Sequence, residues 1–295
     1  MACFGGVEAG GTKFVCAVGD ENGKLLEQLE FPTTSPRETL GQVAEFFCSQ
    51  RRAHDLRAIG IGSFGPLDLN SRSLTFGYIT ATPKPGWRNV EFVGAIQRAT
   101  ELPVRLDTDV NAAALAEGRW GAAQGLETYL YLTVGTGLGG GAVVNGRLLH
   151  GLLHPEMGHI RIPREQADPF AGACPFHRDC LEGLASGPAL EQRWGKPGEN
   201  LPAEHPAWEL EARYLAYGLV SFISILAPER ILMGGGIMQR TTLFPLIRRQ
   251  VQEILNGYIQ APQVSSDIDT YIIPPALGRN AGVLGAIALA QAQCM

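Results

Sequence analysis

The sequence has few charged residues, no excess of basic ones and no long hydrophobic run. Charged residues make up 18% of the chain, and 24 Lys and Arg against 29 Asp and Glu give a formal net charge of −5. Nucleic-acid binding depends on clustered Lys and Arg against phosphates, so we expect no nucleic-acid partner. No apolar run reaches the roughly 18 residues of a membrane helix, and the first residues lack the features of a signal peptide. We therefore expect a cytoplasmic protein with no membrane partner.

Cysteine is also scarce, with six residues in 295. Disulfides are rare in a reducing compartment, so a tight cluster of cysteines is better read as a metal site. One such cluster exists in the pattern His-x14-Cys-x2-His-x2-Cys, formed by His159, Cys174, His177 and Cys180. Two thiolates and two imidazoles suit tetrahedral zinc, and a full ligand set leaves the metal a structural role. A chance cluster is the alternative.

The chain contains no linker rich in Pro or Ser, yet 295 residues are many for one core. We expect two lobes joined by short connections, with a central cleft. The first lobe is expected over residues 1–118, with a C-terminal helix at 281–295 packing back on it. The second is expected over residues 119–280 and would carry the zinc loop.

Two stretches of the chain share one pattern of strand, glycine turn, strand and Asn-Gly turn. The turns are Asn22-Gly23 and Asn145-Gly146, 123 residues apart, and Asn-Gly is typical of tight hairpins. This repeat predicts a duplicated α/β protein in which each half begins with a three-stranded meander. The composition also predicts strands at 56–65, 102–106 and 230–236, and helices at 36–47, 92–99, 110–120, 208–226, 244–255 and 281–293.

Two glycine-rich turns occupy matching places in the two halves. The first, EAGGTK, contains Gly10, Gly11, Thr12 and Lys13; the second, LTVGTGLGGG, contains Thr133, Gly135, Thr136 and Gly137. Glycine lets backbone N–H groups approach anionic oxygens, and hydroxyl and ammonium groups add donors. Either turn alone could be a plain hairpin turn. Together they predict that the two halves hold a polyphosphate, and ATP is the natural candidate.

Two further segments complete the candidate site. LMGGGIM, with Gly234, Gly235, Gly236 and Met238, follows a strand and offers a flat surface for an adenine or a ribose. Asp109 stands where a strand ends and a helix begins, a place where functional groups gather in α/β folds, and we predict that it is the catalytic base. The alternative is that Asp109 only caps the helix. His150 and His154 lie off the zinc spacing and are left out of the metal site.

The segments EAGGTK, SFGPLD, DTDVNAAALAE, TVGTGLGGG, HPEMGH and GPAL together resemble the ROK family of sugar kinases and repressors, and within it the bacterial fructokinase branch. The resemblance covers nearly the whole chain. It implies a duplicated actin-like ATPase fold of the ribonuclease H-like type, a homodimer, and ATP and Mg²⁺ as cofactors. The family's repressors carry an N-terminal helix-turn-helix, but here the phosphate turn begins at residue 8, so we expect none.

The resemblance also implies roles for single residues. Asp109 would take the proton of the sugar hydroxyl, and Glu156 and His159 would bind sugar hydroxyls. Glu182 would touch the sugar, and Gly65 with Pro66 would line its far side. The two glycine turns would contact the ATP phosphates, and Pro188 of GPAL would lie at the nucleotide.

Three departures from the wider family bear on specificity and metal binding. Glu8 replaces the usual Asp and would hold Mg²⁺ through water. Thr108 stands where glucose-specific members usually have Asn. We expect it to contact the sugar. The zinc segment reads CPFHRDC where many members have C-x-C-G-x-x-G-C. The last two departures point towards fructokinase.

The expected reaction is therefore the ATP-dependent phosphorylation of D-fructose to fructose 6-phosphate, with Asp109 as general base. A kinase for mannose, glucose or an N-acetylhexosamine is one alternative, because specificity can depend on one or two hydroxyl contacts. A non-catalytic sugar sensor on the same scaffold is another. A zinc-dependent interaction module would leave most of the chain unexplained.

Overall fold

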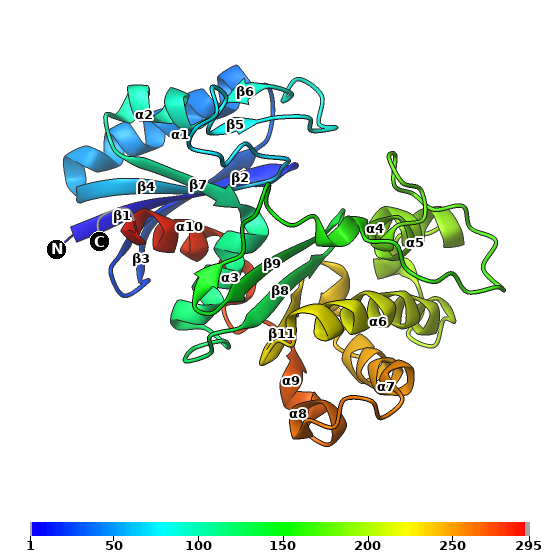
Figure 1. Cartoon of the computed structure of the whole chain (residues 1–295). Coiled ribbons are helices and arrows are strands. Elements are labelled where there is room, and N and C mark those ends of the chain that lie inside the picture. Colours follow the sequence, from blue (N-terminus) through cyan, green and yellow to red (C-terminus); the bar gives the residue numbers. More distant parts are fainter. Residues whose placement is uncertain (1, 293–295) are drawn as a thin grey trace. The chain divides into compact units, whose positions relative to one another are not determined.

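The computed structural model describes residues 2–292, which form two compact units (Figure 1). The first contains the described parts of Met1–Gln124, Leu148–Pro155 and Ala276–Met295, and the second contains Gly125–Arg147 and Glu156–Pro275. The first unit gives way to the second after residue 124, and the second ends at residue 275, whereas the sequence led us to expect these boundaries at residues 118 and 280. The short segment Leu148–Pro155 joins the first unit although both of its chain neighbours belong to the second.

A five-stranded sheet forms the centre of the first unit, in the order β3-β2-β1-β4-β7. Its first three strands pair antiparallel as a meander, and β4 and β7 run parallel to β1. The strands are β1 (Ala2–Ala9), β2 (Lys13–Asp20), β3 (Leu25–Pro32), β4 (Asp55–Ser63) and β7 (Val104–Thr108). A separate two-stranded sheet pairs β5 (Tyr78–Ile79) with β6 (Val90–Glu91).

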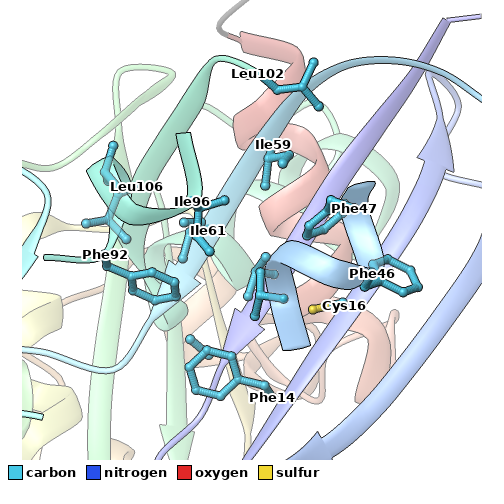
Figure 2. Close-up of a cluster of buried hydrophobic side chains, with 14 of the residues drawn as sticks. Phe14, Cys16, Phe46, Phe47, Ile59, Ile61, Phe92, Ile96, Leu102 and Leu106 are labelled. Atoms are coloured by element: carbon cyan, nitrogen blue, oxygen red, sulfur yellow. The ribbon is translucent and has the colours of Figure 1, made fainter. Parts of the chain in front are cut away.

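One apolar core lies between this sheet and the helices α1 (Pro36–Ala53) and α2 (Val93–Thr100). Figure 2 shows part of this core, in which Phe47 of α1 and Phe92 of the segment before α2 lie with residues of the strands. Ser35 is the N-cap of α1 and accepts a hydrogen bond from the backbone N–H of Glu38 at 3.4 Å, and Pro36 is the first helical residue.

A second core lies on the other face of the sheet, beneath α3 (Asp109–Trp120) and α10 (Ala281–Ala292). Alternating strand residues supply the two cores, since Phe14 and Cys16 face the first and Val15 and Ala17 the second. Glycines let α10 lie directly on its neighbours. A methyl group at Gly60 would come within 1.9 Å of the Ala286 carbonyl oxygen.

A buried carboxylate ties together two segments that adjoin the unit boundaries. Glu117 of α3 is fully buried. Its Oε2 accepts hydrogen bonds from the backbone N–H of Ala122 at 2.7 Å and of Ala276 at 3.1 Å, and its Oε1 accepts one from Leu277 at 2.8 Å. All these groups belong to the first unit. The charge is therefore paired with backbone dipoles, as a buried carboxylate requires.

The second unit repeats the arrangement, with a five-stranded sheet in the order β10-β9-β8-β11-β12. Here β9 is antiparallel to β8, and β11 and β12 are parallel to it. The strands are β8 (Tyr129–Val134), β9 (Leu138–Val144), β10 (Arg147–Leu148), β11 (Arg230–Gly234) and β12 (Ile272–Ile273). The matching strand orders confirm the duplicated α/β architecture.

The helices of the second unit include the long α6 (Ala207–Leu226), which packs on α7 (Leu243–Leu255). The others are α4 (Leu181–Ala185), α5 (Gly187–Trp194), α8 (Pro262–Ser265) and α9 (Ile268–Tyr271), with 3₁₀ turns η1 (Met157–His159), η2 (Gly198–Asn200) and η3 (Ile237–Gln239). A further 3₁₀ turn, η4 (Gly278–Asn280), precedes α10 in the first unit. Within residues 2–292, no helix combines the length and the apolar character needed to cross a membrane.

The expected elements all form, and their ends differ by up to six residues. The largest difference is at α1, which was expected to end at residue 47 and ends at Ala53. The strand expected at 102–106 is β7 at Val104–Thr108. Glu101, in a left-handed conformation with φ 55°, ends α2, and β7 begins three residues later at Val104. The last helix is described from Ala281 to Ala292, and residues 293–295, over which the sequence also expected it to extend, lie outside the described part of the chain.

Candidate active site

The carboxyl ends of three parallel strands meet at one edge of the first sheet. Ala9 of β1 lies beside Ser63 of β4, which lies beside Thr108 of β7. Ligands of open α/β sheets bind outside this kind of edge. Glu8, the Gly65-Pro66 segment and Asp109 lie at or just after the carboxyl ends of these strands. The structure therefore brings together three parts of the predicted site that lie far apart in the sequence.

Asp109 is the first residue of α3, directly after the edge of the sheet. Its Oδ1 accepts a hydrogen bond from the backbone N–H of Val110 at 2.9 Å. The cap of the helix is Thr108, whose hydroxyl accepts from the backbone N–H of Asn111 at 3.2 Å. Because Thr108 performs the capping, the helix does not need the Asp109 carboxylate for that purpose.

The Glu8 carboxylate lies at the beginning of α10. A methyl group at Gly282 would come within 2.4 Å of the Glu8 carboxyl carbon. Burial and the negative charge of Asp109 raise the pKa of Glu8 to about 7, while Lys13 and the backbone N–H of Val283 act in the opposite direction. Glu8 and Asp109 therefore form an acidic pair at the edge of the sheet, where the ionised form of Glu8 needs a cation.

We expect a Glu8→Gln variant to be more stable than the wild-type protein at neutral and higher pH. A carboxyl group with a raised folded pKa lowers the free energy of unfolding as pH rises from about 4.5 to about 7, because the folded state holds the proton more tightly. Gln carries no such charge, so the stability advantage of the variant should grow across that range and level off above it, with an upper limit of about 3 kcal/mol. Urea denaturation across this pH range, with the exposed Glu45→Gln as control, measures the effect. An unchanged pH profile would contradict it.

The first glycine turn connects β1 to β2. The backbone N–H of Gly10 donates to the carbonyl of Lys13 at 3.0 Å, and the hydroxyl of Thr33 donates to the Gly10 carbonyl at 2.8 Å. Gly11 has no neighbouring atom within 4 Å of the place where a Cβ would stand, so the turn opens to a space. The ammonium of Lys13 pairs with Glu30 at 2.7 Å on an exposed surface.

The segment Leu148–Pro155 brings two histidines to the same edge, and sequence reasoning missed both. His154 is buried, and its Nε2 accepts a hydrogen bond from the backbone N–H of Leu67 at 3.1 Å, next to Gly65 and Pro66. His150 lies 2.9 Å from Asp107 of β7, which raises the pKa of His150. The three histidines of HGLLHPEMGH were the only hint in the sequence that this segment is functional. The partners of His150 and His154 are about 40 or more residues away in sequence, so local patterns do not reveal these contacts.

In the second unit, three predicted nucleotide segments lie together. Thr133 at the end of β8 pairs in register with Gly234 of β11. The backbone N–H of Gly187 donates to the Gly135 carbonyl at 2.7 Å. Gly235, with φ 94°, packs against the backbone of Val134, where a side chain would collide. The remaining candidates accompany them on the same segments: Thr136, Gly137, Pro188, Gly236 and Met238.

The N-terminus of α5 also lies at this glycine turn. Its cap is Ser186, which accepts from the backbone N–H of Ala189 at 3.4 Å, and Pro188 belongs to its first turn. The first turn of a helix presents N–H groups and the positive end of the helix dipole, both of which favour an anion. The first turn of α5 thus presents backbone N–H groups at the place where the sequence predicts a phosphate contact.

The residues proposed for the sugar in the second unit gather around the start of β9. Glu182 of α4 accepts a hydrogen bond from the backbone N–H of Leu138 at 3.0 Å, so its carboxylate lies at the second glycine turn. Glu156 begins the 3₁₀ turn that carries His159, whose N–H donates to the Glu156 carbonyl at 3.0 Å. Gly158 lets this turn pack on the Leu138 carbonyl.

The four predicted metal ligands converge. One ligand atom from each of His159, Cys174, His177 and Cys180 lies within 4.8 Å of all the others. Nδ1 of His159 lies 3.7 Å from the Cys174 sulfur and 3.6 Å from that of Cys180. A tetrahedral zinc ion with ordinary bond lengths holds a sulfur and a nitrogen about 3.5 Å apart. The residues therefore fit a Cys2His2 zinc ion.

A second anchor holds the loop that carries these ligands. Asp168 is buried and accepts a hydrogen bond from the Tyr214 hydroxyl at 2.6 Å, and Arg193 lies 3.3 Å from the same carboxylate. Tyr214 belongs to α6 and Arg193 to α5. The loop is therefore attached to two helices as well as to the candidate metal site.

Comparison with known proteins identifies the family. A model of the ROK family matches residues 4–293. The chain belongs to the ROK family. A Bacillus subtilis relative is 52% identical over 287 residues, which are 97% of this chain and 95% of the relative. A fructokinase of Zymomonas mobilis is 47% identical, with 98% of this chain and 96% of the relative covered.

Solved structures agree with this assignment. The crystal structure of a ROK hexokinase from Thermus thermophilus matches with a TM-score of 0.81 and 31% identity, covering 99% of each chain. A ROK glucokinase from Streptomyces griseus, solved with glucose and AMPPNP, matches with a TM-score of 0.76 and 26% identity over 98% of this chain and 99% of that one. The resemblance to the ROK family and the actin-like fold predicted from the sequence are confirmed.

Proposed function

We propose that the protein is an ATP-dependent hexose kinase and that its substrate is D-fructose, which it converts to fructose 6-phosphate. The observation that carries this proposal is whole-chain similarity. Fructokinases of Pediococcus pentosaceus and Zymomonas mobilis are 43% and 47% identical to the chain, whereas a glucokinase of Streptomyces coelicolor is 28% identical. Thr108, in place of the Asn of glucose-specific members, supports the same choice.

Asp109 acts as the general base in this proposal. The sugar hydroxyl attacks the terminal phosphorus of ATP as its proton passes to the Asp109 carboxylate, and ADP leaves. Phosphoryl transfer needs little other covalent chemistry, so the remaining residues bind and orient. Gly65, Pro66, Glu156, His159 and Glu182 are the proposed sugar contacts, with Thr108 beside them.

The glycine turns of both units are the proposed phosphate ligands, with Gly234–Met238 at the nucleoside. Mg²⁺, when bound, neutralises phosphate charge, and Glu8 would hold it through water. The raised pKa of Glu8 supports this assignment, because a divalent cation would compensate the paired carboxylates. Zinc at His159, Cys174, His177 and Cys180 would have a structural role, since four protein ligands leave no open position.

The proposed assembly follows the family resemblance. We propose a homodimer, the commonest closed assembly, in the cytoplasm. Gel filtration with light scattering would test the dimer. A single protomer mass in solution would contradict it.

A substrate panel tests the activity. ADP release is measured with Mg-ATP and fructose, mannose, glucose, N-acetylglucosamine or N-acetylmannosamine. We expect the highest kcat/KM with fructose, and mass spectrometry should place the phosphate on the 6-hydroxyl. A higher kcat/KM with another hexose would contradict fructose as the substrate but would still support a hexose kinase. Sugar binding without turnover of any sugar would contradict the kinase and favour a sensor.

A further inference from the structure

The phosphate turn of the first unit is accompanied by a lysine that does not belong to the turn itself. Lys84 lies in the segment ATPKPGW between β5 and β6. Its ammonium donates a hydrogen bond to the carbonyl oxygen of Gly11, at the open tip of the turn. The lysine within the turn, Lys13, instead pairs with Glu30 at 2.7 Å. We propose that Lys84, and not Lys13, is the catalytic cation that binds the phosphates of ATP, an inference that rests on the proposed kinase function.

The segment around Lys84 is anchored firmly. The backbone N–H of Lys84 donates to the hydroxyl of the buried Thr82 at 3.3 Å, and its carbonyl accepts from the backbone N–H of Trp87 at 3.2 Å. The Trp87 side chain is fully buried, and its indole N–H donates to the Thr34 carbonyl at 2.9 Å. Pro83 and Pro85 on either side of Lys84 restrict the backbone further.

Aromatic packing connects this anchor to the glycine turn. The Trp87 ring lies 5.5 Å from the ring of Phe14, the residue that follows Lys13 on β2, and 5.5 Å from that of Phe64, which follows β4. The base of the Lys84 segment and the two strands that meet at the sheet edge are thus one packed cluster. A cation held on such a base needs little reorganisation to meet developing charge, which is the property that makes electrostatic catalysis effective.

The Gly11 carbonyl is a weak partner for an ammonium compared with a phosphate oxygen. The carbonyl is neutral, whereas a phosphate oxygen carries negative charge and adds the attraction of opposite charges to the hydrogen bond. When ATP occupies the turn, the ammonium exchanges the carbonyl for a phosphate oxygen. During transfer a bond forms between the sugar oxygen and the γ-phosphorus, and the bond from that phosphorus to the bridging oxygen of ADP breaks. The hydroxyl proton goes to Asp109, and Lys84 keeps all its protons.

Lys84→Met tests the proposal, with Lys84→Arg, Lys13→Met and the exposed Lys24→Met beside it. We expect Lys84→Met to lower kcat/KM for Mg-ATP by about 10²- to 10³-fold, the usual effect of removing one transition-state donor. Lys84→Arg should recover part of this loss because it keeps the charge. Lys24→Met should behave as the wild-type protein. Fructose affinity, measured by calorimetry, should be the same in all four variants.

Binding measurements test the role of Lys84 independently of whether the protein phosphorylates a sugar. Calorimetry with Mg-ATP, and with inorganic tripolyphosphate, should show weaker binding by Lys84→Met and a smaller dependence of affinity on salt, even if no sugar is phosphorylated. Turnover and nucleotide affinity within twofold of the wild type in Lys84→Met would overturn the proposal. So would a larger loss in Lys13→Met, or a loss of fructose affinity with nucleotide affinity unchanged. Circular dichroism and the melting temperature report whether Lys84→Met is folded.

Discussion

An Asp109→Asn variant is expected to phosphorylate fructose about 10²- to 10⁴-fold more slowly than the wild-type protein, the range typical of a lost general base. Asn has nearly the same size, and its carbonyl oxygen can still accept the hydrogen bond that Val110 donates at 2.9 Å. It cannot take a proton from the sugar. The loss should therefore fall on kcat, with the binding of fructose and Mg-ATP close to that of the wild type.

Helix capping provides the control for this result. The cap of α3 is Thr108, so replacement of Asp109 should leave the melting temperature nearly unchanged. Asp55→Asn, at an exposed carboxylate paired with Arg57, should keep full activity. Rates are measured by ADP release, stability by thermal denaturation. Turnover by Asp109→Asn within tenfold of the wild type would rule out its role as the base, and a large drop in stability would make its role structural.

A Cys174→Ser variant is expected to lose bound zinc and to destabilise the loop of residues 160–180. Cys174 is buried, and its sulfur lies 3.7 Å from His159 and 3.8 Å from His177. A serine hydroxyl stays protonated and is a poor zinc ligand. The purified wild-type protein should contain about one zinc per chain, and the variant much less, by elemental analysis. Sugar affinity should fall as well, because His159 is both a metal ligand and a proposed sugar contact.

The contacts of Asp168 should confine the effect of zinc loss to the loop. Asp168 remains attached to Tyr214 and Arg193, so we expect local loosening, seen as faster hydrogen exchange in residues 160–180, with the rest of the second unit protected. Cys48→Ser, at an exposed thiol, is the matched control and should keep its zinc and its stability. Wild-type protein that contains no zinc after purification, and that a chelator neither inactivates nor destabilises, would refute the metal site.

Local sequence signals predicted much of the fold because they act over a few residues. The Ser35 cap with Pro36 started a helix where expected, and the Asn145-Gly146 turn joined two strands. Ends of elements were less predictable: β7 begins two residues late, since the way the chain leaves α2 depends on packing. The convergence of the four candidate metal ligands was predictable because three of them lie within seven residues and share a distinctive chemistry.

Spatial neighbours that are distant in sequence were not predictable. No pattern in HGLLHPEMGH indicates that His154 will meet Leu67 or that His150 will meet Asp107, because these pairs form when Leu148–Pro155 folds on the first unit. Likewise Lys13 is the lysine that the turn sequence suggests, yet the strand pairing of β2 with β3 turns it towards Glu30.

The sequence by itself therefore determined the duplicated α/β pattern, the glycine turns, the helix caps and the metal-ligand spacing, all of which depend on the conformational preferences and chemistry of neighbouring residues. Tertiary structure decided which side chains accompany those elements. It placed Glu8 at the start of α10, Lys84 at the tip of the first glycine turn and Glu117 against the segments at the unit boundaries. These contacts depend on how helices and strands pack, and packing combines residues from many parts of the chain.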